Sequence, residues 1–106
     1  MTRSDDQRIA DILDACDELG VVVGLRREGK MSDLVLLRAA ERLLEIMGEA
    51  AANVSEEGMT RYAGVDWRNM SRLRIVLAHH YHRTDPELVW SFANEEVPAL
   101  ATALRT

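Results

Sequence analysis

Apolar residues recur along this chain at intervals of three and four, the spacing of amphipathic helices, and no segment keeps the alternation of a β-strand. The first such series predicts a helix over residues 5–23, with Ser4 and Gln7 placed to form a capping box at its start. Gly24 and the polar residues after it predict the end of this helix and a loop. The expected apolar face consists of Ile9, Ile12, Leu13, Cys16, Leu19 and Val23.

A second apolar series follows from Asp33 and predicts the longest helix, about six turns ending near Val54. Residues 55–66 interrupt the pattern with two glycines, and Asp66 is well placed to cap a third helix that starts at Trp67. The second series consists of Leu36, Leu37, Ala40, Leu43, Leu44, Met47, Ala50, Ala51 and Val54.

A further helix start is indicated after residue 83, where an oxygen-bearing cap precedes a proline and a glutamate: Thr84, Asp85, Pro86 and Glu87. Pro98 predicts a kink or a restart in the segment that follows. These elements predict an all-α fold, an up-and-down bundle of four to five helices in which residues 1–106 form one domain.

Bulk properties narrow the function classes. A chain of 106 residues builds one modest core, and no run of about 18 apolar residues is present to suggest a membrane span. The polar, acidic N-terminus does not resemble a secretory signal, so we expect a cytoplasmic protein with no membrane contact. Cys16, the lone cysteine, falls among apolar positions and is expected to be a buried structural thiol.

The net charge of −5 disfavours a protein that coats nucleic acid over its whole surface. Residues 61–83 differ from the rest, because they hold five arginines and one acid, which makes this segment +4 and leaves −9 for the remainder (−5 − 4). All three histidines fall in the same segment. It is interpreted either as a solvated helix face or as a localised basic site.

Arg74 and His79 are the candidate chemical groups. On an ideal helix Arg74 lies along the apolar stripe, so its guanidinium either pairs with a core carboxylate such as Glu45 or Glu49 or lines a cleft. His79 lies about 140° further around the helix, so the two side chains converge only at a loosened helix end or across a second copy of the chain.

The residues around His79 provide a cationic surround suited to an anionic substrate. Arg68, Arg72 and Arg83 fall within about 40° of its face on an ideal helix. Repulsion from these like charges favours a neutral imidazole that accepts a proton.

The segment RIVLAHHY places an arginine, four residues, a histidine, one residue and a tyrosine at Arg74, His79 and Tyr81. With its flanking blocks, RAAERLLEIMGEAAANVS, VDWRNM, TDPELVW and EEVPAL, the chain resembles the HepT-like ribonucleases of the HEPN superfamily over residues 8–104. This resemblance implies a helical homodimer that cuts RNA without a metal or other cofactor, with Arg74 and His79 as catalytic residues.

The same resemblance implies a toxin of a toxin–antitoxin pair, silenced when a small nucleotidyltransferase antitoxin attaches AMP to Tyr81. The residues expected to help bind RNA are Arg68, Arg72, His80, His82 and Arg83. Two positions depart from the family pattern. Ile75 stands where a polar residue is usual, and His80 stands where glycine is usual, which adds bulk and a second imidazole.

Two alternatives belong to other classes. Ile75 favours an inactive helical dimer that serves only as a binding module for a nucleotidyltransferase. His79, His82 and Asp85 step by three and have a spacing compatible with a zinc site, although no cysteine or second histidine pair elsewhere would complete it.

Overall fold

The computed structural model describes residues 3–79 and 85–105; within α4 it leaves out the side chains of Arg72, Arg74, Ile75, Val76, Ala78 and His79. All elements in this part of the chain are helical, and the prediction of an all-α bundle is confirmed. The elements are α1 (Asp5–Glu28), α2 (Asp33–Ala52), α3 (Glu56–Arg61), α4 (Trp67–His79), α5 (Pro86–Ser91), a π-helical turn η1 (Phe92–Glu96) and α6 (Val97–Arg105).

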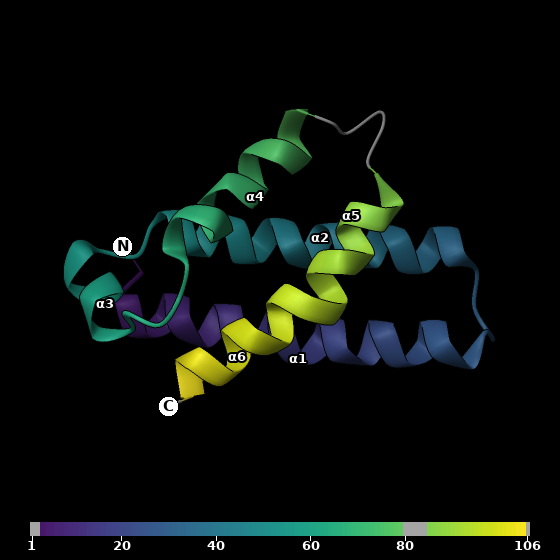
Figure 1. Ribbon diagram of the computed structural model, residues 1–106, viewed down its shortest axis with the longest axis horizontal. Helices are drawn as coiled ribbons and strands as arrows, with labels where there is room; N and C mark the ends of the chain where they lie inside the picture. Colours follow the sequence, from purple (N-terminus) through teal and green to yellow (C-terminus); the bar gives the residue numbers. More distant parts are fainter. Residues whose placement is uncertain (1–2, 80–84, 106) are drawn as a thin grey trace.

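Helices α1 and α2 form a long antiparallel hairpin, and α4 and the rod made of α5, η1 and α6 lie across it (Figure 1). The hairpin and α4 bury one apolar core whose most enclosed side chains are Ile12, Leu19, Leu36, Leu44 and Met47. Burial of such side chains is the main stabilising contribution in a domain of this size.

The start of α1 agrees with the sequence prediction. Ser4 accepts a hydrogen bond from the backbone N–H of Gln7 at 3.1 Å, and the Gln7 side chain accepts one from the Ser4 N–H at 2.8 Å, which completes the capping box. Acidic residues occupy the first turn and basic residues the last, an arrangement that favours the helix dipole.

The predicted end of this helix near Gly24 is wrong. Helix α1 continues to Glu28, so α1 with 24 residues, and not α2 with 20, is the longest helix of the described part. The residue that ends α1 is Gly29, which adopts the left-handed conformation with φ 67°. A glycine inside a helix costs only about 1 kcal/mol relative to alanine, so Gly24 does not stop a helix whose neighbours are buried against α2. A tight four-residue turn therefore joins α1 to α2.

The sequence analysis predicted a break in the helical pattern over residues 55–66. The structure has the short helix α3 within this segment, so the prediction was only partly right. Ser55 caps α3 and donates two hydrogen bonds to Asp5 of α1, from its N–H at 3.0 Å and from its hydroxyl. These bonds hold the pKa of Asp5 below its ordinary value. Gly58 packs so closely that a Cβ there would lie 2.7 Å from Asp5 Oδ2 and from Val54 Cγ1.

Pro98 lies at a restart of the α-helix, as predicted, because α6 begins at Val97 after the π-helical turn η1. The π-helical turn η1 lies immediately before it, and the Val97 N–H bonds to the carbonyl of Phe92. A wider turn accommodates a residue that has no N–H and whose ring would otherwise press on a preceding carbonyl. The rod consequently runs on through α6, where Arg105 pairs with Asp17 of α1 at 2.7 Å.

Candidate functional site

Helix α4 carries the first part of the predicted motif, and its start is fixed by two side chains. The Asp66 carboxylate accepts a hydrogen bond from the Asn69 N–H at 3.0 Å, as expected of the predicted cap. The indole N–H of Trp67 donates to the carbonyls of Met59 at 3.2 Å and Tyr62 at 3.0 Å. Trp67 thereby ties the loop between α3 and α4 to the first turn of α4.

The buried face of α4 packs on α2. Trp67, Met70 and Leu73 are buried, and Leu77 is half-buried. This is the apolar stripe along which the sequence analysis placed Arg74. Arg74 lies one helical turn beyond Met70, so its backbone is on the side of α4 that meets the core.

The motif residues divide into two groups. Arg72, Arg74 and His79 belong to a continuous α4, with His79 as its last residue, but their side chains lie outside the described part. The remaining predicted site residues, His80, Tyr81, His82 and Arg83, lie entirely outside the described residues. The convergence of Arg74 and His79 on a common substrate remains a prediction.

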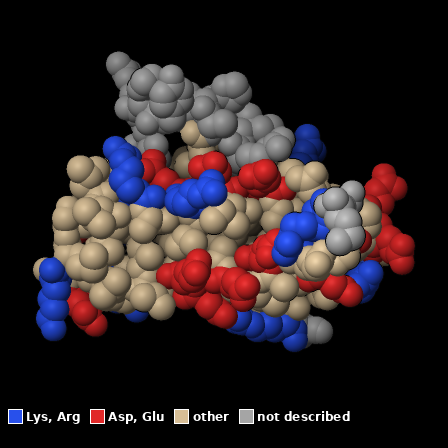
Figure 2. All heavy atoms as spheres, turned by 180° about the vertical axis from the view of Figure 1, so that it is seen from behind, with Lys and Arg blue, Asp and Glu red and all other residues tan. Residues whose placement is uncertain are grey.

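Two arginines of the basic segment have described side chains. Arg68 is exposed on the first turn of α4, and its role in binding RNA remains a prediction. Arg61 pairs with Asp6 of α1 at 3.1 Å and thus has a structural partner. Figure 2 shows one face of the molecule, on which basic side chains are interspersed with acidic ones.

The alternatives for Arg74 and for a metal site are not resolved by the described residues. Glu45, one proposed partner of Arg74, pairs with Arg42 on its own helix at 3.0 Å. Asp85, one proposed zinc ligand, caps α5 by accepting a hydrogen bond from the Glu87 N–H at 3.0 Å. Residues 3–79 and 85–105, as far as their side chains are described, contain no group of three metal-binding side chains.

Cys16 is a free, buried thiol, as predicted. Its sulfur lies 4.0 Å from the sulfur of Met47, and burial raises its pKa to about 11. A thiol with such a pKa is almost entirely protonated at neutral pH, so Cys16 is a poor nucleophile.

Comparison with known proteins identifies the family. The family model described as "Ribonuclease HepT-like" matches residues 12–106, which include all of α2 and α4. This chain belongs to the HepT-like ribonuclease family. The match extends well beyond the eight-residue motif, and it confirms the resemblance seen in the sequence.

Individual relatives agree with this assignment. A "Putative RNase" of Methanocaldococcus jannaschii is 37% identical over 64% of this chain and 56% of its own length. A second "Putative RNase", of Caldanaerobacter subterraneus subsp. tengcongensis, is 34% identical over 84% of this chain and 80% of its own length. The "Probable ribonuclease HepT" of Thermococcus cleftensis is 29% identical over 94% of this chain and 92% of its own length. The chain thus spans little more than half of the first relative and most of the other two.

No solved structure is significantly similar to this chain. Among the helices of the described part, none is long and apolar enough to cross a membrane.

Proposed function

We propose that this HepT-like protein is a metal-independent RNA endonuclease and the toxin of a toxin–antitoxin pair. The observation that supports it most strongly is the family match over residues 12–106, which includes the Arg74–His79–Tyr81 spacing. Helix α4, anchored through Trp67, carries the Arg74 and His79 positions of that spacing.

In the proposed reaction, His79 takes the proton from a ribose 2′-hydroxyl, whose oxygen then attacks the adjacent phosphorus. Arg74 stabilises the additional negative charge on the phosphoryl oxygens, because its planar guanidinium holds two of them while staying charged. The bond to the 5′-oxygen breaks, and that oxygen takes a proton from an acid, for which His80, His82 or the second subunit's imidazole is the candidate. The products are a 2′,3′-cyclic phosphate and a 5′-hydroxyl.

Substitution of the two catalytic candidates tests this reaction. We expect His79→Ala and Arg74→Ala each to slow cleavage of single-stranded RNA by about a hundredfold or more, the scale of general-base and charge-stabilisation effects. Arg74→Lys should fail as well, because a point charge does not replace the two-pronged guanidinium. Cys16→Ser, the control, should cleave normally. Intact RNA with the unmodified parent protein, or cleavage abolished by EDTA, would contradict the proposal.

We further propose that the protein acts as a homodimer and that AMP attached to Tyr81 silences it. A nucleotide on Tyr81 would place negative charge and bulk beside the arginines that bind the substrate phosphate. Co-expression with a nucleotidyltransferase antitoxin should raise the mass of the chain by one or more AMP units, and Tyr81→Phe should remain unmodified and toxic. Light scattering at low micromolar concentration tests the dimer, and a stable monomer would remove the two-subunit site.

Ile75 favours a second candidate function, an inactive helical dimer that binds a nucleotidyltransferase. Full cellular toxicity of the His79→Ala variant would support this binding module over the nuclease.

A further inference from the structure

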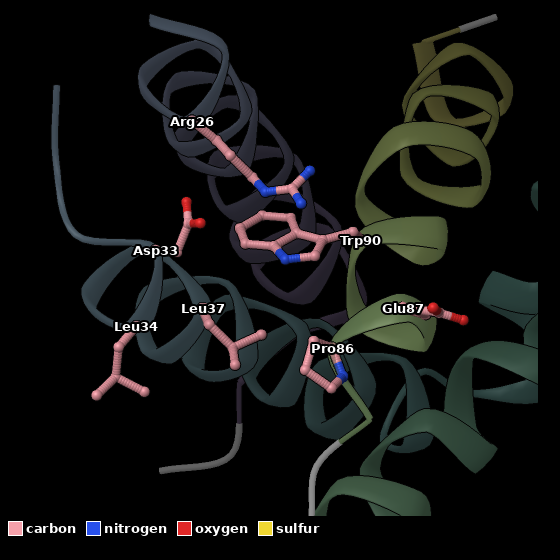
Figure 3. Close-up of a pocket in the computed structure, with 7 residues that line it drawn as sticks. All are labelled: Arg26, Asp33, Leu34, Leu37, Pro86, Glu87 and Trp90. Atoms are coloured by element: carbon pink, nitrogen blue, oxygen red, sulfur yellow. The ribbon is translucent and has the colours of Figure 1, made fainter. Parts of the chain in front are cut away.

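A hollow of about 540 Å³ lies at the end of the bundle where α1 turns into α2 and where α5 begins. Its volume falls in the range of small-molecule sites, which are mostly apolar with a few placed polar groups. Figure 3 shows the side chains around it: Arg26, Asp33, Leu34, Leu37, Pro86, Glu87 and Trp90.

The centre of the hollow is a stack of two planar groups. The guanidinium of Arg26 lies 4.4 Å from the centroid of the Trp90 ring, and Arg26 is exposed. The guanidinium of Arg26 thus covers a face of the indole and does not occupy the in-plane direction of its N–H. Unpaired nucleobases are recognised by hydrogen bonds along their edges.

The indole N–H of Trp90 is a hydrogen-bond donor without an acceptor among the described residues. Trp90 is only 8% exposed. No described side-chain nitrogen that is closed off from solvent lacks a partner, so the unpartnered Trp90 nitrogen keeps some solvent access. Figure 3 shows the indole nitrogen on the ring edge that faces Leu37 and Pro86. A ligand atom that accepts a hydrogen bond would satisfy it.

The charges at the hollow disfavour a phosphate as the recognised group. Arg26 is the one cation among the described residues that line the hollow, and Asp33 and Glu87 are both acidic. Glu87 points away from the ring in Figure 3, whereas Asp33 lies beside Arg26 and offers carboxylate oxygens to a donor. An uncharged ring with an acceptor and an amino group on its edge fits this arrangement better than an anion.

We propose that this hollow binds a purine base. The base lies beside the edge of the Trp90 ring, accepts a hydrogen bond from Trp90 Nε1–H, and donates from an amino or ring N–H group to Asp33. Arg26 covers a face of the indole, and Leu34, Leu37 and Pro86 form the apolar wall. The purine belongs either to an RNA strand or to a free nucleotide. The first source rests on the proposed ribonuclease function.

The position of the hollow is compatible with an RNA strand that also reaches the motif. Seven peptide steps separate His79 from Pro86, and a fully extended chain covers at most roughly 25 Å in seven steps. A short single strand of RNA therefore suffices to reach from the His79 position to a base held beside Pro86.

Nuclear magnetic resonance provides a binding test that is independent of cleavage. The two tryptophans give two indole N–H signals, which the Trp67→Phe and Trp90→Phe variants assign. GMP and AMP should shift the Trp90 signal and leave the Trp67 signal in place, since the latter N–H is occupied by two carbonyls. UMP should shift it less, and ribose 5-phosphate should not shift it.

Substitutions then test the individual contacts through the backbone amide signals of Asp33 and Leu37. Arg26→Ala should raise the Kd for GMP at least about fivefold, because it removes the group that holds the indole in place, and Trp90→Phe about threefold to tenfold, as expected for a lost hydrogen bond. Arg27→Ala is the matched control, because Arg27 is the adjacent arginine and does not line this hollow; its Kd should stay within about twofold.

A non-cleavable 2′-O-methyl purine oligonucleotide separates the two sources. Binding at least about tenfold tighter than GMP indicates a strand, and equal binding indicates a free nucleotide. The proposal is wrong if ribose 5-phosphate shifts the Trp90 signal as GMP does, or if Arg26→Ala binds GMP normally. It is also wrong if Arg26→Ala changes only the oligomeric mass, a result that would make this face a protein interface. An inactive protein that still binds GMP would refute the nuclease and keep this site.

Discussion

The two ends of the α1–α2 hairpin are built in opposite ways. At the α3 end, the Trp67 indole N–H bonds to two carbonyls, and Gly58 lets α3 pack against Asp5 without a gap. At the α5 end, the Trp90 N–H has no acceptor among the described residues, and an open hollow lies beside the ring. The α3 end is closely packed, as is typical of a region that stabilises the fold. The α5 end leaves hydrogen-bonding groups available, as is typical of a binding site.

The largest expected contrast is between the two tryptophans. Trp67→Phe removes a donor from two carbonyls and leaves a small void, so we expect a loss of about 2 kcal/mol in the free energy of unfolding. Trp90→Phe leaves a similar void but removes a donor that has no acceptor among the described residues, so its loss should be smaller than that of Trp67→Phe by about 1 kcal/mol. Urea unfolding followed by circular dichroism measures both. Equal losses would remove the distinction between the two ends.

Glycine substitutions break the closed end selectively. Gly58→Ala places a methyl group against Asp5 and the branched side chain of Val54, and overpacking of this kind costs about 1–3 kcal/mol. Gly20→Ala is the matched control, since no atom lies within 4 Å of the place that its new methyl group would take, and it should stabilise α1 by about 0.5–1 kcal/mol. Thermal unfolding of the two variants should therefore shift in opposite directions.

At the open end, Arg26 contributes little to stability. Arg26→Ala removes an exposed cation–π contact, worth about 0.5–1 kcal/mol, while Arg27→Ala should have no measurable effect. Urea unfolding is the measurement, and a loss above about 2 kcal/mol would mean that this end also stabilises the fold.

The smallest expected effect is on the stability of the protein at acidic pH, through Asp5. Hydrogen bonds from Ser55 lower the pKa of Asp5, so the ionised carboxylate binds α3 better than the protonated one. The resulting stability is present above the ordinary pKa of 3.8 and is lost as pH falls below it, through the lowered pKa. Asp5→Asn should therefore unfold with a weaker pH dependence below about pH 4; an unchanged dependence would contradict this role.

Local patterns in the sequence predicted most of the framework. Ser4, Gln7 and Asp66 cap their helices as expected, because a cap depends on residues three positions apart. The end of α1 was mispredicted, since Gly24 and Gly29 look alike in sequence and only packing against α2 decides which one ends the helix.

The two candidate sites also differ in whether their residues are close together in the sequence. Arg74, His79 and Tyr81 are close together in the chain, so their spacing identified the family before any fold was considered. Arg26 and Trp90 meet only because the rod crosses the hairpin, and no local pattern links them. Trp90 had a weaker signal, because it ends the TDPELVW block that resembles the family.

The ion pair between Arg105 and Asp17 has a consequence for folding kinetics. The α1–α2 hairpin closes through a four-residue turn and is rich in local contacts, which form quickly and at low entropic cost. Arg105 and Asp17 are 88 positions apart, so their contact closes a long loop and brings little stability until α6 is docked. We expect the hairpin to nucleate folding and α6 to join late, which means that weakening this ion pair should speed unfolding and leave the folding rate nearly unchanged.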